Sequence, residues 1–207
     1  MLYECFQGVF AQKPSAKQPS FSIRRAVRNK GNRAIFILYD LSIGESMTPI
    51  YRLLVDLALK EALGGETNGR THLFLDELKL LPKITHLEDA LNFGRSKRVS
   101  VVAGLQSIGQ IFEAYGHDTG KVILGGFSSL FAFHTPDYES RQYISQLFGP
   151  NITAYRYHNA SEQPIDRERD GHTVEEWQLQ QLKSGHAVVG LASQAEPFPF
   201  HFELDPF

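Results

Sequence analysis

Short apolar runs alternate with segments of helical periodicity through the middle of the chain, and this alternation restricts the folds available to it. The strand-like runs occupy residues 34–39, 71–76, 99–105 and 130–133. The segments of helical spacing that follow them occupy residues 50–62, 85–94, 107–114, 117–125 and 136–148. Strands and helices in alternation favour a parallel sheet. We therefore expect an α/β fold with a mainly parallel sheet, helices on both faces and strands buried on both sides.

Capping residues predict where the helix at 50–62 begins and ends. Ser46 is its expected N-cap, with Pro49 in the first turn, because proline is tolerated where backbone N–H groups lack partners. Gly64 and Gly65 are expected to end the helix.

The C-terminal quarter of the chain has a different pattern. Residues 158–172 are polar and predict a loop. A helix is expected over 173–182, opened by a capping box of Thr173 and Glu176. Strands are expected at 186–192 and 198–204, and Pro197 and Pro199 predict that the second strand lies at a sheet edge.

Composition and charge exclude several classes of protein. The chain has 207 residues, 42% of them hydrophobic, which is enough for a sizeable core. Its net charge of −2 gives no overall positive field that would indicate nucleic acid or a membrane surface. Cys5 is the only cysteine, which excludes an intrachain disulfide. Residues 1–20 lack the features of a secretory signal, and we expect a poorly ordered lead-in before a single domain over residues 21–207.

Two adjacent carboxylates, Asp76 and Glu77, follow the apolar residues of the second run. In parallel α/β sheets, ligands bind at the carboxyl ends of the strands. An aliphatic strand followed by Asp and Glu has the geometry of a Walker B element, in which the Asp holds Mg²⁺ and the Glu polarises the water that attacks the γ-phosphate. The same residues also fit a strand that reaches solvent and begins a turn, and this alternative stays open.

Gln106 follows the third run, where P-loop ATPases of RecA-like layout place a polar sensor. A sensor of this kind hydrogen-bonds the γ-phosphate or the attacking water. We expect Asp76, Glu77 and Gln106 to meet at neighbouring strand ends and to form a pocket for Mg²⁺ and a triphosphate. Gln106 also fits a simple turn residue next to a helix start.

Three basic residues, Arg95, Lys97 and Arg98, lie between a predicted helix and the next strand. An arginine here could reach the γ-phosphate held by a neighbouring subunit, as an arginine finger, because its planar fork suits phosphate oxygens. Lys97 and Arg98 are candidate contacts for DNA. Basic residues at a helix C-terminus also complement the helix dipole, which is the simpler explanation for each of them.

The segment at residues 64–71, GGETNGRT, nearly fits the Walker A pattern, with Arg70 in place of lysine. A P-loop follows a strand and opens a helix, so that its amides surround the phosphates. This segment follows a helix and opens a strand, and we reject it. No other segment fits, so the sequence lacks the Walker A strand-loop-helix.

A longer stretch, LFLDELKLLPKITHLEDALNFGRSKRVSVVAGLQSIGQIFEAYG, resembles the central segment of type IV secretion coupling proteins of the TraG/TraD class. These are hexameric inner-membrane ATPases of bacterial conjugation, related to FtsK/HerA translocases. The matching positions are Leu81, Pro82, Leu87, Ala90, Gly94, Arg95, Gly104, Leu105, Gln106, Ser107, Gln110, Tyr115 and Gly116. The resemblance covers roughly residues 20–150.

The resemblance implies a RecA-like P-loop NTPase core that acts with ATP and Mg²⁺. Asp76 would be the Mg²⁺ carboxylate, Glu77 the catalytic carboxylate, Gln106 the sensor and Arg95 an intersubunit arginine finger. The P-loop and the transmembrane segments that precede this region in the family are absent from the sequence. We therefore expect the C-terminal part of a coupling ATPase, inactive by itself.

The resemblance also implies partners. The parent would be a homo-hexamer at the cytoplasmic face of the bacterial inner membrane, with single-stranded DNA in its central pore and with relaxosome and secretion-channel proteins as partners. The 207-residue chain itself would be soluble and cytoplasmic. Two alternatives stay open: a non-catalytic module that recruits relaxosome or secretion proteins, and an FtsK/HerA-type translocase of double-stranded DNA unrelated to secretion.

Overall fold

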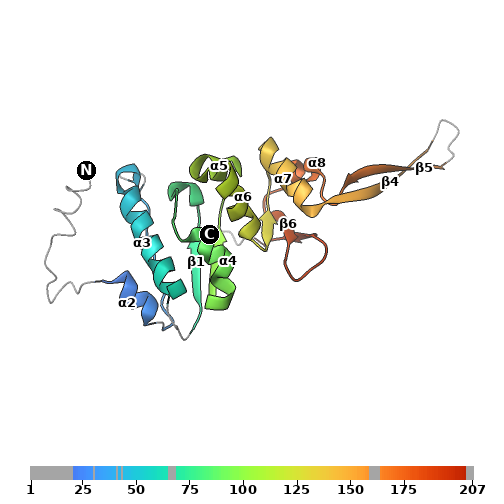
Figure 1. Cartoon of the computed structure of the whole chain (residues 1–207). Coiled ribbons are helices and arrows are strands. Elements are labelled where there is room, and N and C mark those ends of the chain that lie inside the picture. The colour runs from blue at the N-terminus through green and yellow to red at the C-terminus, as the bar shows by residue number, and fades with distance from the viewer. Residues whose placement is uncertain are drawn as a thin grey trace. The chain divides into compact units, whose positions relative to one another are not determined.

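The computed structural model describes residues 21–29, 31–40, 42, 44–64, 69–158 and 164–203. The expected lead-in at 1–20 lies outside these residues. The chain divides into two compact units, Met1–Leu105 and Gln106–Phe207 (Figure 1). The single domain expected over residues 21–207 stays a prediction.

The first unit is built on a parallel pair of short strands. The pair consists of β1 (Thr71–Leu75) and β2 (Val99–Ala103), in register from Thr71 opposite Val99 to Leu75 opposite Ala103. The helices are α2 (Ile23–Arg28), α3 (Gly44–Gly64) and α4 (Leu87–Lys97), with a 3₁₀ turn, η1 (Leu78–Leu80). Leu59, Leu78 and Leu87 are among its fully buried side chains. The expected strand-helix-strand unit of β1, α4 and β2 is confirmed.

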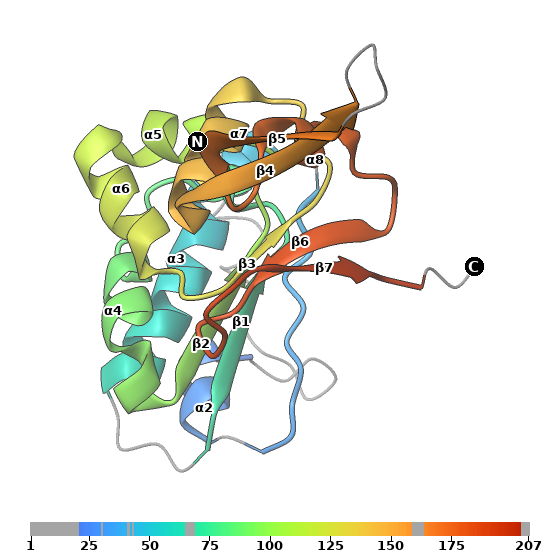
Figure 2. The ribbon, with the colours of Figure 1, turned by 90° about the vertical axis from the view of Figure 1, so that its right-hand side faces the viewer.

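Helices cover one face of the strand pair, and Figure 2 shows α3 and α4 on the same side of it. Leu75 and Val99 are buried on that face. On the other face, Phe74 is 72% exposed and Val102 is 54% exposed. The expectation that these strands are buried on both sides is therefore wrong for β1 and β2, because no described element of their unit covers the second face.

The apolar run at 34–39 is not a strand in the structure. It runs without strand pairing, and Phe36 is 84% exposed and Leu38 82% exposed. A strand needs a hydrogen-bonded neighbour, and none of the described strands pairs with this run. The apolar residues by themselves could not supply that partner.

The helix expected at 50–62 is confirmed as α3, but it begins earlier. Ser46 lies inside the helix rather than at its N-cap, and Pro49 is also internal. The Thr48 hydroxyl donates a hydrogen bond to the Gly44 carbonyl oxygen at 2.9 Å, within the first turn. Gly64 ends the helix as predicted.

The second unit contains a three-stranded antiparallel sheet and several short helices. The sheet has the order β3 (Leu130–Ala132), β6 (His186–Gly190) and β7 (Phe198–His201), so β7 lies at an edge as predicted. The helices are α5 (Gly109–Tyr115), α6 (His117–Gly126), α7 (Tyr138–Phe148) and α8 (Glu176–Gln181). The core of this unit joins the sheet to α7 and α8 through Ala132, Ile144, Val174 and Leu179.

The loop expected at 158–172 is largely a β-ribbon. β4 (Pro150–His158) and β5 (Pro164–His172) pair antiparallel along their whole length, and Figure 1 shows the ribbon projecting beyond α7 and α8. Asn151, Ile152 and Asp170 are exposed. The described residues 168–170 of β5 are charged and exposed, and the sequence of β5 has no apolar alternation, so it looked like a loop.

The start of α8 also differs from the prediction. Glu175, not Thr173, is the N-cap, and its side chain forms a capping box with Gln178, not Glu176. The box is shifted by two residues because glutamate also accepts the N3 amide and glutamine also binds back to the cap.

Candidate active site

The carboxylates of Asp76 and Glu77 follow directly at the carboxyl end of β1. Asp76 is exposed, and Glu77 is the N-cap of η1 with extended backbone angles. The Glu77 Oε1 atom is buried and has no hydrogen-bond partner in the described part of the chain. A buried carboxylate oxygen without a partner is unfavourable unless something else binds it. The pair therefore offers the Asp76 carboxylate to solvent and one buried oxygen of Glu77 to a further donor.

Main-chain hydrogen bonds hold this turn against the end of β2. The Gly104 amide donates to the Leu75 carbonyl oxygen at 2.8 Å, and the Leu78 amide donates to the Gly104 carbonyl oxygen at 3.1 Å. A Cβ placed on Gly104 would lie 2.0 Å from the Asp76 carbonyl oxygen. Glycine is therefore required here for the backbone carrying Asp76 and Glu77 to lie against the second strand end.

Gln106 is exposed and is the first residue of the second unit, joined to Gly104 through Leu105 alone. It does not cap α5, whose N-cap is Ile108. That Gln106 meets Asp76 and Glu77 in one pocket stays a prediction.

The residues after Gln106 are tied to the start of α7. The Ser107 hydroxyl donates to Asp137 Oδ2 at 3.2 Å and accepts the Gly109 amide at 3.1 Å. The Ile108 amide donates to the Ser140 hydroxyl oxygen at 3.0 Å. The segment that carries the predicted sensor is thus fixed to the N-terminus of α7.

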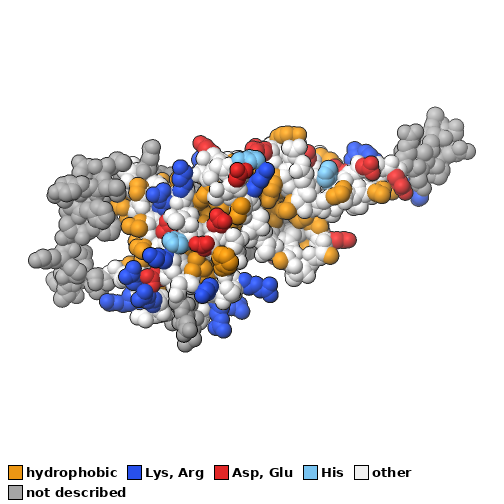
Figure 3. All heavy atoms as spheres, viewed as in Figure 1, with side chains coloured by type: hydrophobic (Ala, Val, Ile, Leu, Met, Phe, Trp, Pro, Cys, Tyr) orange, Lys and Arg blue, Asp and Glu red, His pale blue; other side chains and the backbone are white. Residues whose placement is uncertain are grey.

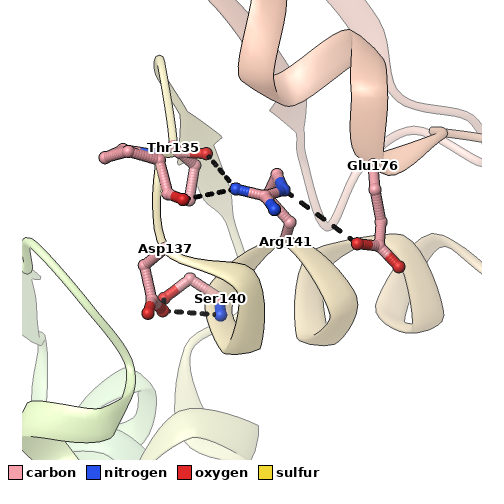
Figure 4. Close-up of polar contacts among 6 residues, drawn as sticks. Thr135, Asp137, Ser140, Arg141 and Glu176 are labelled. Atoms are coloured by element: carbon pink, nitrogen blue, oxygen red, sulfur yellow. Dashed lines mark hydrogen bonds and ion pairs between the residues drawn. The ribbon is translucent and has the colours of Figure 1, made fainter.

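Asp137 is the centre of this network and the N-cap of α7 (Figure 4). The Ser140 hydroxyl and amide donate to its Oδ2 at 2.6 and 2.8 Å. These hydrogen bonds, the hydroxyl first, hold the pKa of Asp137 below its ordinary value. Its role was missed from the sequence, from which we predicted only a helix over residues 136–148.

Arg141 connects the same helix to α8 (Figure 4). Its guanidinium donates to the carbonyl oxygens of Thr135 and Pro136 and lies 4.0 Å from the Glu176 carboxylate. The side chain is 12% exposed. We interpret Arg141 as structural.

The basic residues Arg95, Lys97 and Arg98 are exposed at the C-terminal end of α4. Because β1 and β2 are parallel and α4 leads into the start of β2, this end lies at the amino ends of the strands, opposite Asp76. Arg98 is the C-cap in the left-handed conformation, with φ 56°. A Cβ on Gly94 would lie 2.7 Å from the Val99 carbonyl oxygen, so this glycine allows the end of α4 to pack against β2.

An open hollow lies at this end of the first unit, lined by Arg70, His72, Arg95, Arg98, Val99 and Ser100. Figure 3 shows Lys and Arg side chains gathered where α4 ends and β1 begins. The hollow brings Arg95, predicted as an arginine finger, next to Arg98, predicted as a DNA contact. It also contains Arg70 and His72. Lys97 is not among its lining residues.

A cation site would have few ligands from the described residues. They contain no cluster of three or more His, Cys, Asp or Glu side chains that could hold a metal ion. Mg²⁺ usually binds through one or two carboxylates together with substrate phosphates and water. The exposed Asp76 carboxylate fits that pattern as a single protein ligand.

None of the described helices is both long enough and apolar enough to span a bilayer.

A family model described as the type IV secretion-system coupling protein DNA-binding domain matches residues 4–200. The chain belongs to this family. Among curated relatives, the conjugal transfer protein TraG of Rhizobium radiobacter is 34% identical over 124 residues, 58% of this chain and 19% of the relative. The coupling protein TraD of Escherichia coli K12 is 28% identical over 160 residues, 73% of this chain and 22% of the relative. The coupling-protein family expected from the sequence is confirmed.

Solved structures of this family share the fold. The conjugative coupling protein TrwBdeltaN70 matches with a TM-score of 0.79 and 26% identity, over 92% of this chain and 46% of that chain. TrwB in complex with ADP and Mg²⁺ matches with a TM-score of 0.75 and 26% identity. The α/β fold of RecA-like P-loop type is confirmed. The chain spans about a fifth of the curated relatives it matches and about half of the structural ones.

Proposed function

We propose that the chain supplies the hydrolytic side of the nucleotide site in a conjugative coupling ATPase. The observation that carries this proposal is the placement of Asp76 and Glu77 at the carboxyl end of β1, locked against Gly104 at the end of the parallel neighbour. This is the strand edge at which α/β proteins bind ligands. Membership of the coupling-protein family and the solved complex of TrwB with ADP and Mg²⁺ support the same placement.

Each side chain has a distinct part in this proposal. The exposed Asp76 carboxylate would hold Mg²⁺, which when bound offsets phosphate charge. Glu77, whose buried Oε1 has no partner among the described residues, would accept a hydrogen bond from the attacking water and orient it. Gln106 would hydrogen-bond the γ-phosphate or that water. The phosphate cradle would come from a P-loop, and the 207 residues contain no segment that fits one.

Arg95 would act between subunits. It lies at the amino ends of β1 and β2, whereas Asp76 and Glu77 lie at the carboxyl end of β1. A side chain at the opposite end of the strand pair is better placed to reach a nucleotide bound by a neighbouring copy than one bound at Asp76 and Glu77 of its own chain. This arrangement supports an assembly in a ring, and we propose the homo-hexamer with Arg95 as the arginine finger.

The assembled protein would move DNA toward a secretion channel. The relatives are named for conjugal transfer and coupling, and the family model describes a DNA-binding domain. We propose single-stranded DNA in a central pore, relaxosome and channel proteins as partners, and an inner-membrane anchor in the parent. Lys97 and Arg98 are the proposed DNA contacts.

A mating assay tests this function. Asp76→Ala in the element that encodes the protein should lower DNA transfer at least about a hundredfold, while the protein is present at its normal level. Asp89→Ala, an exposed carboxylate on α4, is the matched control and should transfer normally. Unchanged transfer by Asp76→Ala, together with capture of relaxosome proteins by the variant, would favour the non-catalytic module instead.

A further inference from the structure

The basic hollow at the amino ends of β1 and β2 brings together three arginines from two places in the sequence. Arg70 precedes β1, Arg95 lies in the last turn of α4, and Arg98 is the C-cap of that helix. The Thr71 amide donates to the Arg98 carbonyl oxygen at 2.9 Å, so the backbone positions that carry Arg70 and Arg98 are held together. The convergence is therefore fixed by main-chain contacts, not by the flexible side chains.

The floor of the hollow carries two polar side chains from the exposed face of the strands. His72 and Ser100 are cross-strand partners, and His72 Nδ1 lies 2.6 Å from the Ser100 Oγ atom in a shared hydrogen bond. This bond fixes the imidazole and leaves its Nε2 atom as a further polar group.

None of the described carboxylates neutralises the positive charge of the hollow. No carboxylate of the described residues forms an ion pair with Arg70, Arg95 or Arg98. By contrast, Arg24 and Arg28 of the same unit both pair with Glu61. Three like charges in one hollow repel one another, and a bound anion would relieve that repulsion.

The C-terminus of α4 opposes an anion here, because the last carbonyl groups of a helix carry partial negative charge. Two of them, on Gly94 and Arg95, already accept the Arg98 amide. The helix C-terminus carries about half a negative charge, whereas the three guanidinium groups carry three full positive charges. The balance favours a multiply charged anion over a single carboxylate.

We propose that Arg70, Arg95 and Arg98, with His72, form a binding site for a compact oligophosphate, which leaves Lys97 as the remaining proposed DNA contact. One guanidinium group can donate two parallel hydrogen bonds to two phosphate oxygens. Three such groups therefore suit a chain of linked phosphates. The proposal extends the arginine-finger role of Arg95. It rests on that role for the identity of the natural ligand, which would be the nucleotide of a neighbouring subunit. The binding itself needs no hydrolysis.

Calorimetric titration of the 207-residue chain with sodium tripolyphosphate tests the site. The double variant Arg70→Gln/Arg98→Gln should raise the Kd at least about tenfold, as expected for loss of charged hydrogen bonds. The matched control is Lys121→Gln, an exposed residue of α6 in the second unit, which should leave the Kd unchanged. Arg95 stays in place, so a result here is independent of the finger role and of ATP hydrolysis.

Two further measurements guard the interpretation. Arginine side-chain NMR signals of Arg70, Arg95 and Arg98 should shift on addition of tripolyphosphate in the wild-type chain, and circular dichroism should show that the double variant is folded. Absence of binding, or equal loss in the double variant and Lys121→Gln, would overturn the site. Tighter binding of a single-stranded oligothymidine than of tripolyphosphate, lost in the double variant, would overturn the oligophosphate in favour of a nucleic-acid backbone.

Discussion

The Asp76 carbonyl oxygen lies against the Cα of Gly104 so closely that a Cβ there would stand 2.0 Å from it. This contact joins the end of β1 to the end of β2 at the point where the two proposed catalytic carboxylates begin. The geometry of the site therefore depends on a residue that has no side chain to take part in the chemistry.

Gly104→Ala should destabilise the first unit, because the new methyl group collides with main-chain atoms that cannot move independently. We expect a loss of about 1–3 kcal/mol in the free energy of unfolding, measured by urea denaturation. Gly125→Ala is the matched control: it lies in α6, and a Cβ there meets nothing within 4 Å. The control should be neutral or more stable by up to about 1 kcal/mol. Equal stability of the two variants would contradict the tight contact.

Asp137→Ala should weaken the start of α7 and release the segment after Gln106. Loss of an N-cap carboxylate destabilises by about 0.5–2 kcal/mol. Hydrogen exchange should become faster at the Ser140 amide, which donates to Asp137, and at the Ile108 amide, which donates to Ser140. Asp118→Ala, a fully exposed residue at the start of α6, should leave both amides unchanged. Unchanged exchange in Asp137→Ala would show that the network does not hold this segment.

Glu61 should make the stability of the first unit depend on pH. It is 8% exposed on α3 and pairs with Arg24 and Arg28 of α2 at 2.7 and 2.5 Å. Burial alone would raise the pKa of Glu61, but the two guanidinium groups outweigh it and hold the pKa below the ordinary value of 4.5. A lowered folded-state pKa means that this stabilisation is present above pH 4.5 and is lost as the pH falls through the folded-state pKa.

Glu61→Gln should therefore lose stability relative to the wild type at pH 6–7, and the difference should shrink as the pH falls below about 4.5. Unfolding free energies measured between pH 3 and 7 check this. Glu88→Gln, an exposed residue on α4, serves as the control and should show no such narrowing. A pH-independent difference for Glu61→Gln would contradict the ionised pairing.

The strands and helices that could be predicted are those whose signals are local. β1, α4 and β2 each carry an apolar pattern within a few residues, and Asp76 and Glu77 follow directly from the end of that pattern. The run at 34–39 has an equally apolar pattern, but a strand also needs a distant partner, which no local pattern encodes. The ribbon of β4 and β5 shows the reverse, because β5 forms a paired strand from a sequence that has no apolar alternation.

The basic hollow could not be predicted for a related reason. In the sequence, Arg70 stands out only within the near-match to a phosphate loop at residues 64–71, which does not fit the position of a P-loop. The parallel register that sets Thr71 opposite Val99 is what brings Arg70 to Arg98. Arg70 and Arg98 directly precede the first paired residues of the two predicted strands. This placement, together with the basic end of α4, was the signal from which the hollow could have been predicted.

ATP hydrolysis by Glu77→Gln tests the central claim most directly. The chain is extended by the P-loop region of the proposed parent protein, and turnover is measured with and without single-stranded DNA. The account predicts DNA-stimulated hydrolysis, a fall in kcat of at least about a hundredfold in Glu77→Gln, and unchanged binding of a fluorescent ATP analogue. Hydrolysis by Glu77→Gln at the wild-type rate would contradict it.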